Sequence, residues 1–371
     1  MTEQRLSAVV LAAGEGSRMR STRPKPLHLL CGRAMVLYVL DALPRDQVDR
    51  AVVVVGHHAE RVTKKLTEDG AGLQLEFVEQ RIQRGTGDAV AVGLTGLPDD
   101  DLDTEDHDVL VLLGDTPLLR RETIAGLVEA HRSSGAACTI LTAILDDPTG
   151  YGRIVRVGKD DRVARIVEQA DAAPDELEID EINTGIFCFR RSLLAPALRK
   201  VQPDNAQGEL YLTDVVEVLA EAGHKVVTVV ADDPSETAGV NDRAQLAAAE
   251  ARLRARTNRD WLARGVTMVD PDTTYVDTTV TLAADVTLFP GTILQGRTTI
   301  GEGVEIGPGC RLVDCTVGER TTLEHTVAHL SEIGADCVVG PYAALEPGSQ
   351  VTSGTRTGPF YTAGAASGLD D

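Results

Sequence analysis

Residues 300–312 read IGEGVEIGPGCRL, with an isoleucine followed by a glycine at position 300 and again at position 306. Aliphatic residues continue this six-residue spacing along the surrounding chain. The first series is Leu282, Leu288, Leu294, Ile300, Ile306 and Leu312, and the second is Val327, Ile333, Val339, Leu345 and Val351. This period is typical of hexapeptide repeats, in which each repeat forms one flat side of a triangular parallel β-helix. The sequence therefore predicts such a β-helix, with these side chains pointing inward and an offset between the two registers near Val317.

The first part of the chain has a different pattern. From residue 6 to about 240, short apolar runs at 8–13, 51–55, 109–113 and 139–145 alternate with stretches patterned like amphipathic helices. This alternation predicts a Rossmann-like α/β domain, with a mainly parallel sheet covered by helices. Ligands of such folds bind at the carboxyl ends of the strands, so the polar residues directly after the apolar runs are the first candidates for chemistry.

A helix is predicted between these two parts. Residues 243–264 are rich in alanine, leucine and arginine, and Gly265 follows them. These residues are strong helix formers, and glycine commonly ends a helix. The sequence thus predicts a first domain at 1–242, a connecting helix at 243–264, a β-helix at 265–355 and a tail at 356–371.

Composition limits the classes of function. The chain has 371 residues and a net charge of −21, which excludes the broad basic face that binds a nucleic-acid backbone. No apolar run approaches the roughly 18 residues of a membrane helix, and the run at 8–13 is too short for a secretory signal. The six cysteines contain no CxxC pair, which argues against zinc and against a disulfide framework. We expect a cytoplasmic protein that binds neither nucleic acid nor membrane.

A glycine-rich stretch, LAAGEGSRM at 11–19, follows the first predicted strand, and RPKPLH at 23–28 comes after it. Gly14 and Gly16 let the backbone approach a polyphosphate closely, and successive N–H groups can cradle its oxygens. Arg18 and Lys25 would add positive charge. The alternative is an ordinary strand-to-helix turn with solvated basic residues, because the stretch is neither GxGxxG nor a Walker A loop.

The complete stretch resembles the signature of the nucleotide-sugar pyrophosphorylases, and further segments follow in that family's order. They are VEQ at 78–80, GTG at 85–87, GDTP at 114–117, GYGRI at 150–154, VEQ at 167–169, EINTG at 181–185, NAQ at 205–207, ELYLTD at 209–214 and GVNDR at 239–243. Together with the hexapeptide repeats, residues 6–360 resemble the bifunctional N-acetylglucosamine-1-phosphate uridyltransferase/glucosamine-1-phosphate acetyltransferase family. The resemblance implies that the β-helix is left-handed and that the protein is a homotrimer.

Joining a sugar 1-phosphate to a nucleoside triphosphate requires in-line attack on the α-phosphate. Negative charge crowds there, so positioning and neutralisation should dominate catalysis. A divalent ion bridging the phosphates meets this need, and Mg²⁺ typically takes one or two protein oxygens. Asp115, at the end of an apolar run, is the natural ligand, although it could instead cap a helix. The resemblance implies Asn241 as its partner.

The resemblance also implies roles around the reacting groups. Arg18 and Lys25 would hold the phosphates and stabilise the charge that develops during the reaction. The nucleotide would contact Leu11, Ala12, Ala13, Gly14 and Gly114, with its base against Gln80, Gly85 and Thr86. The sugar would face Gly152, Glu168 and Asn183, with Tyr211 and Thr213 nearby.

The sequence departs from the family in its last segment. There the family carries an acetyl-coenzyme A site and a catalytic histidine, whereas this sequence has small residues after Tyr361 and ends at Asp371. Glu346 also replaces a usual arginine, so a carboxylate would repel the sugar phosphate. We therefore expect no acetyltransferase activity and a β-helix that serves as a trimerising scaffold.

Two further departures flank the predicted base and sugar contacts. Asp88 replaces the usual histidine of the uridyltransferases, and Ala170 replaces a frequent lysine. The leading hypothesis is a Mg²⁺-dependent enzyme that forms UDP-N-acetylglucosamine and pyrophosphate from UTP and N-acetylglucosamine 1-phosphate. One alternative is the same chemistry on another sugar or cyclitol 1-phosphate, or with another base. A second is a non-catalytic trimeric scaffold that binds nucleotide sugars, against which the presence of Lys25, Asp115 and Asn241 argues.

Overall fold

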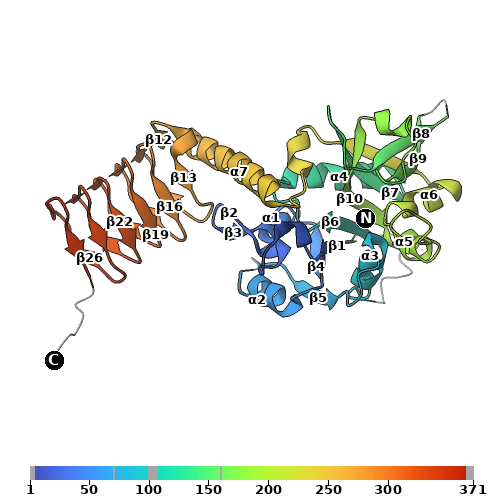
Figure 1. Cartoon of the computed structure of the whole chain (residues 1–371), viewed down its shortest axis with the longest axis horizontal. Coiled ribbons are helices and arrows are strands. Elements are labelled where there is room, and N and C mark those ends of the chain that lie inside the picture. Colours follow the sequence, from blue (N-terminus) through green and yellow to red (C-terminus); the bar gives the residue numbers. More distant parts are fainter. Residues whose placement is uncertain (1–4, 70–71, 99–106, 159–160, 365–371) are drawn as a thin grey trace. The chain divides into compact units, whose positions relative to one another are not determined.

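The computed structural model describes residues 5–69, 72–98, 107–158 and 161–364, and the chain forms two compact units (Figure 1). The first unit contains the chain up to His28 together with Ala34–Leu246, and the second contains Leu29–Arg33 and the chain from Ala247 onward. Within the described ranges, no helix is both long and apolar enough to cross a bilayer.

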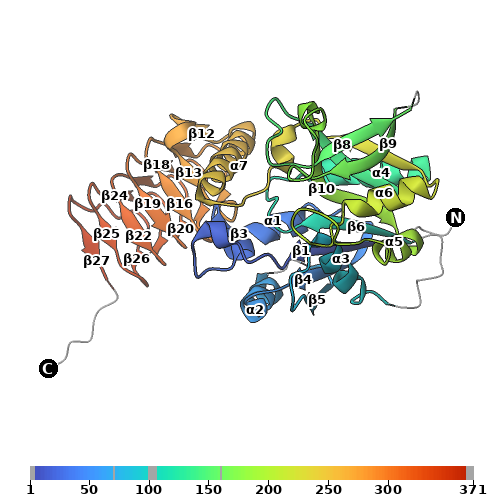
Figure 2. The same cartoon turned by 45° about the vertical axis from the view of Figure 1, so that its right-hand side comes forward.

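A mainly parallel sheet forms the centre of the first unit, with strand order β11-β7-β10-β6-β1-β4-β5. Strand β1 lies between β4 and β6 and is parallel to both, whereas β10 is antiparallel to its neighbours β6 and β7. The antiparallel hairpin β8–β9 extends the sheet beside β10 (Figure 2). The strands are β1 (Arg5–Ala12), β4 (Val48–Val55), β5 (Leu75–Glu79), β6 (His107–Leu113), β7 (Cys138–Ile144), β8 (Arg153–Val157), β9 (Arg162–Val167), β10 (Glu181–Arg190) and β11 (Val226–Val230).

Helices cover both faces of this sheet, because its central strands are apolar on both sides. In β1, Ala8 and Val10 belong to one buried core, which α1, α2 and α4 share. Val9 faces the opposite core, which α3, α5 and α6 share. The helices are α1 (Met35–Asp41), α2 (Ala59–Asp69), α3 (Thr86–Leu94), α4 (Arg121–Ser134), α5 (Arg191–Leu198) and α6 (Asp214–Glu221). This arrangement confirms the predicted α/β fold.

The second unit is a parallel β-helix preceded by helix α7 (Arg243–Ala263). Three short sheets form its sides, and in each sheet a strand pairs in parallel with the strand one coil further along (Figure 1). One sheet contains β12 (Thr267–Met268), β15 (Thr287–Leu288), β18 (Glu305–Ile306), β21 (Thr322–Leu323) and β24 (Val338–Val339). Another contains β13 (Tyr275–Val276), β16 (Ile293–Gln295), β19 (Arg311–Val313), β22 (Val327–His329), β25 (Ala344–Leu345) and β27 (Thr362–Ala363). The third contains β14 (Thr281–Leu282), β17 (Thr299–Ile300), β20 (Thr316–Val317), β23 (Glu332–Ile333) and β26 (Gln350–Val351).

The predicted β-helix is confirmed, with one error in its inward positions. Val327 is 45% exposed, and Ala328 is the fully buried residue of β22. The reason is local shortening of the coil: the buried residues Leu323, Ala328 and Ile333 follow one another at intervals of five rather than six. The strands also continue to β27, beyond the predicted end at residue 355; residues 365–371 of the predicted tail lie outside the described ranges.

A short segment distant in sequence packs within the second unit. The Cys31 N–H donates a hydrogen bond to Glu250 Oε2 at 2.8 Å, and the Thr278 N–H donates to the Cys31 carbonyl at 3.1 Å. No periodicity in the sequence indicates that Leu29–Arg33 groups with α7 and the β-helix.

Candidate active site

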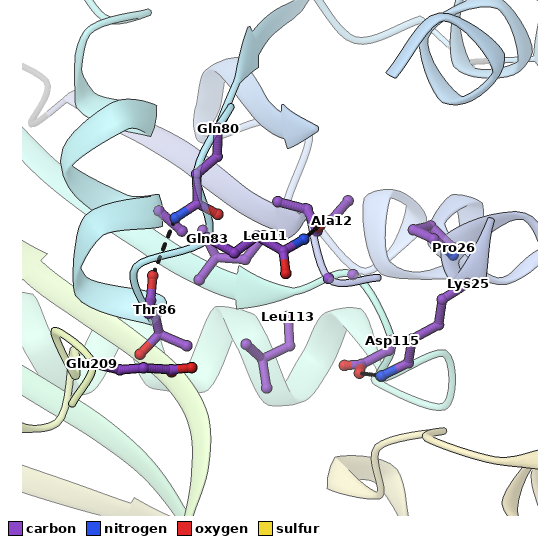
Figure 3. Close-up of a pocket in the computed structure, with 15 residues that line it drawn as sticks. Leu11, Ala12, Lys25, Pro26, Gln80, Gln83, Thr86, Leu113, Asp115 and Glu209 are labelled. Atoms are coloured by element: carbon purple, nitrogen blue, oxygen red, sulfur yellow. Dashed lines mark hydrogen bonds and ion pairs between the residues drawn. The ribbon is translucent and has the colours of Figure 1, made fainter. Parts of the chain in front are cut away.

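Two adjoining pockets open in the first unit at the carboxyl ends of its parallel strands. The larger has a volume of about 340 Å³ (Figure 3), and the other has a volume of about 250 Å³. The larger is lined by the predicted residues Leu11, Ala12, Ala13, Gly14, Lys25, Gln80, Gly85, Thr86, Gly114 and Asp115. The smaller is lined by Gly152, Glu168, Asn183, Thr213 and Asn241, and it shares Leu11, Thr86 and Asp115 with the larger. Asp115 therefore lies where the two pockets meet.

Charged and amide side chains converge at this junction. Asp115 follows β6, and Lys25 begins the short 3-10 helix Lys25–Leu27. The Lys25 ammonium donates to the Asp115 carboxylate and, at 2.8 Å, to Asn241 Oδ1. Arg18 donates to the same Asn241 oxygen at 3.1 Å. Figure 3 shows Lys25 and Asp115 pointing toward each other. The structure thus brings together side chains from three separate parts of the sequence.

The loop after β1 is shaped by glycine. Gly16 has a φ of +65°, and a Cβ atom there would lie 2.6 Å from Lys25 Cβ. Only glycine lets the chain turn here while Lys25 packs so closely. A Cβ at Gly14 would have no neighbour within 4 Å, so this backbone is open to a ligand. The Gly114 N–H donates to the Leu11 carbonyl at 2.8 Å, which fixes the ends of β1 and β6 against each other.

A second loop closes the far end of the larger pocket. Gly85 has a φ of +113°, and a Cβ atom there would lie 2.4 Å from the Leu210 carbonyl oxygen. The same carbonyl accepts a hydrogen bond from the Gly87 N–H at 2.8 Å, at the start of α3. Gln80, directly after β5, is buried and lines this end of the pocket. The segment 80–87 is therefore held against residue 210 by backbone contacts.

The smaller pocket has polar walls. Thr213 donates to Glu168 Oε1 at 3.1 Å, and the Asn183 N–H donates to the Gly152 carbonyl at 2.8 Å. Burial raises the pKa of Glu168 above its usual range. Burial, and secondarily the charge of Asp115, raises the pKa of Tyr151. Hydroxyl, amide and carboxyl groups of this kind suit a ligand rich in hydroxyl groups.

Comparisons with known proteins agree with this geometry. Residues 7–251 match the family model of the nucleotidyl transferases. The bifunctional protein GlmU of Streptomyces avermitilis is 47% identical over 95% of this chain and 72% of its own length, and GlmU of Heliobacterium modesticaldum is 44% identical over 95% and 75%. The chain belongs to the GlmU family of nucleotidyl transferases. A Bacillus anthracis crystal structure assigned as a glucose-1-phosphate thymidylyltransferase, in complex with a sucrose, supports the fold alone. Its TM-score is 0.52 at 19% identity, and the match covers 67% of this chain and 95% of that chain.

Membership in the GlmU family confirms the predicted enzyme class, a sugar-1-phosphate nucleotidyltransferase of the uridylyltransferase type. The predicted residue roles remain predictions. Two of the predicted residues do not line either pocket. Arg18 lies at the junction of the pockets without lining either of them. Tyr211 is 8% exposed and lines neither of these two pockets, and burial raises its pKa to about 12.

Some lining residues of this GlmU-family site were missed in the sequence. Gln83 lines the larger pocket and donates to the Ala13 carbonyl at 2.6 Å, and Tyr151 lines the smaller one. Tyr151 lies inside the quoted GYGRI segment, so its position next to Gly152 was an available signal. Gln83 is an isolated amide in a polar loop, and no feature of the sequence distinguishes it from a solvated residue.

Proposed function

We propose that this GlmU-family protein transfers the uridylyl group of UTP to N-acetylglucosamine 1-phosphate, forming UDP-N-acetylglucosamine and releasing pyrophosphate. The observation that supports this most directly is the convergence of Lys25, Asp115 and Asn241 where the two pockets meet. A two-substrate displacement needs one pocket for each substrate, with the reacting phosphates between them. The junction also supplies the charged groups that such a reaction requires.

The larger pocket is the proposed nucleotide site. The base would contact Gln80, Gly85 and Thr86, while the phosphates would lie along the backbone of residues 11–14 and Gly114. Lys25 and Arg18 would donate hydrogen bonds to phosphate oxygens, because they are the cations at the junction. Their role is to bind and orient the triphosphate and to stabilise negative charge as the bond to pyrophosphate breaks.

The smaller pocket is the proposed sugar site. Gly152, Glu168, Asn183 and Thr213 line it and would bind the hydroxyl and acetamido groups. The sugar phosphate would then point toward Asp115, which lines both pockets. Tyr211 is buried and lines neither pocket, so it would act by holding its neighbour Thr213 in place.

We also propose Mg²⁺ at Asp115 and Asn241. The residues fit this ion, because the Asp115 carboxylate and the Asn241 amide oxygen both contact the Lys25 ammonium. A positive charge therefore already occupies the position between the two oxygens. Two protein oxygens are a usual number for Mg²⁺, which keeps waters and phosphate oxygens as its other ligands. The bound ion would neutralise charge on the phosphates and hold them in line. Lys25 would then be released to bind phosphate.

We further propose a homotrimer formed through the β-helix, and a cytoplasmic location. The β-helix carries large apolar side chains at its surface, including Val327 (45% exposed) and Phe360 (73% exposed). All six cysteines are free, which suits a reducing compartment.

Pyrophosphate release tests the proposed reaction. UTP, CTP, dTTP, GTP and ATP would each be combined with N-acetylglucosamine 1-phosphate, glucosamine 1-phosphate and glucose 1-phosphate, with and without Mg²⁺. The expected result is Mg²⁺-dependent activity that is highest with UTP and N-acetylglucosamine 1-phosphate. A different preferred pair would overturn the proposed substrates, and no turnover with any pair would favour a non-catalytic binding protein. Coenzyme A release from acetyl-coenzyme A and glucosamine 1-phosphate is expected to stay at background, because Glu346 would repel the sugar phosphate.

Two variants test the junction. Asp115→Ala is expected to abolish Mg²⁺-dependent turnover without changing the circular dichroism spectrum. Lys25→Ala is expected to lower kcat by about 10²–10³-fold, since a preorganised charge at the reacting centre typically contributes this much. Lys64→Ala is the control, because Lys64 is 78% exposed and lies on α2. Substantial Mg²⁺-dependent activity in Asp115→Ala would refute the metal assignment.

A further inference from the structure

The amide of Gln80 is held in one orientation at the base end of the larger pocket. Gln80 is 5% exposed, and its Nε2 donates to Asp88 Oδ2 at 2.8 Å and to the Gly85 carbonyl at 3.3 Å. Figure 3 shows the amide nitrogen of Gln80 pointing toward the segment that contains Thr86. Gln80 thus has two partners on one side of its amide and the pocket on the other.

The chemistry of these partners determines which end of the amide faces them. A carboxylate and a carbonyl oxygen only accept hydrogen bonds, whereas an amide has a donating NH₂ end and an accepting oxygen end. The NH₂ group of Gln80 must therefore face Asp88 and Gly85, since the reverse orientation would place oxygen against oxygen. Consequently the amide oxygen, Oε1, is the group that Gln80 offers to a base.

Asp88 contributes more to this orientation than Gly85 does. Its contact with Gln80 is shorter, and a hydrogen bond to an ionised acceptor is roughly twice as strong as a neutral one. Asp88 also lies in the first turn of α3, where the helix dipole favours a negative charge. The carboxylate is therefore well placed to keep the amide from rotating.

We propose that Asp88 is a positioning residue for base selection, which fixes Gln80 so that the pocket accepts a base donating an N–H and disfavours one presenting a lone pair. Uracil and thymine donate from N3, whereas cytosine presents a lone pair at N3 and would meet Oε1 acceptor to acceptor. UTP and CTP have nearly the same size and the same triphosphate charge, and they differ only at N3 and at the group on C4. A change in their ratio on substitution of Asp88 therefore reports on how the site reads this edge of the base. The inference rests on the proposed function, because it assumes that the base lies against Gln80.

The test compares kcat/KM for UTP with kcat/KM for CTP, at saturating N-acetylglucosamine 1-phosphate and Mg²⁺, in the native enzyme and in Asp88→Asn. Asparagine has the same shape as aspartate but offers either a donor or an acceptor, so Gln80 could rotate and remain paired. We expect the UTP preference to fall by at least about tenfold, because sites that pair a substrate group discriminate by large factors. Asp88→Ser, which also both donates and accepts, should act in the same direction and serves if Asp88→Asn folds poorly.

The control is Glu79→Gln, which also removes one negative charge. Glu79 directly precedes Gln80 in the sequence, and its side chain is 52% exposed and faces Arg81. This variant should leave the UTP-to-CTP ratio unchanged. A general structural defect in the Asp88 variants would lower both kcat/KM values together and leave their ratio intact, and that result would overturn the inference. If the native enzyme turned over neither nucleotide, the proposed function itself would fail. A native enzyme that prefers UTP with variants that keep the full preference would refute only the role of Asp88.

Discussion

Asp214, the first residue of α6, makes the stability of the first unit depend on pH. Burial, followed by the charges of Glu217 and Glu168, raises the pKa of Asp214 to about 6. The folded protein therefore binds more protons than the unfolded chain between about pH 4 and pH 6, so this residue lowers stability as the pH rises through that range. We expect Asp214→Asn to raise the melting temperature at pH 7.5 by roughly 2–4 °C, which corresponds to about 1 kcal/mol after allowance for solvent screening.

Thermal unfolding at several pH values checks this expectation. The advantage of Asp214→Asn should shrink below pH 6 and vanish near pH 4, where the native carboxyl is protonated as well. Glu60→Gln is the matched control, because Glu60 is also an acidic residue in the first turn of a helix but is exposed. An advantage that is constant across the pH range would contradict the role of the carboxyl.

At the same scale, the sequence predicts the position of a residue near the end of a strand better than the position of a residue that depends on packing. Asp115 comes two residues after the apolar strand β6, so its place at the sheet edge could be predicted from order along the chain. Asn241 came only from the resemblance, because the sequence separates it from Lys25 by more than 200 positions and nothing local links them. Tyr211, which the resemblance places near the sugar, lines neither pocket, because an aromatic ring beside polar residues suits a buried position as well as a pocket wall.

At the scale of elements, the β-helix depends on one inward residue per side. Ile306 and Glu305 are the two residues of β18, and Ile306 is fully buried whereas Glu305 is exposed. Ile306→Ala should destabilise the second unit by about 2–5 kcal/mol, because it leaves a cavity between coils. Glu305→Ala should change stability by no more than about 0.5 kcal/mol.

Trp261 provides the measurement. It is the single tryptophan of the chain, it lies in α7, and it packs against the core of the β-helix. Its fluorescence during urea unfolding therefore reports on the second unit. Equal shifts of the midpoint for both variants would contradict the assignment of inward and outward positions.

The register of the β-helix also shows where a periodic pattern is insufficient. The spacing of six holds from Leu282 to Leu312, and these residues were identified correctly as buried. Val327 and Ala328 then follow each other in the sequence. Because valine is the more hydrophobic of the two, hydrophobicity alone predicts that Val327 points inward. The shorter corner places the alanine inside, and corner length depends on backbone conformation, such as the positive φ of Asp314 and His325, which the pattern does not encode.

At the scale of the whole molecule, the exposed apolar residues of the second unit predict self-association. Tyr275 and Val327 lie on the outer face of the same β-helix sheet and are 43% and 45% exposed. Tyr342 and Phe360, whose rings stack at 5.4 Å, are also exposed. The stacked rings of Tyr342 and Phe360 form an exposed aromatic patch, and apolar patches of this kind often mark an interface. The expected assembly is a trimer, with a mass three times the 39.5 kDa of the chain.

Light scattering of the native protein and of Val327→Glu tests this prediction. A charge on this outer face would have to be buried in every interface. Arg311 is its neighbour on the adjacent strand, but burying such an ion pair is still costly, so the variant should be monomeric at micromolar concentration. Thr299→Glu, exposed on a different sheet, should remain trimeric. Both pockets are lined only by residues of the first unit, so monomeric Val327→Glu should retain most of the uridylyltransferase activity of each chain. A monomeric native protein would contradict the trimer, and a Thr299→Glu variant that dissociates while Val327→Glu does not would move the interface to the other sheet.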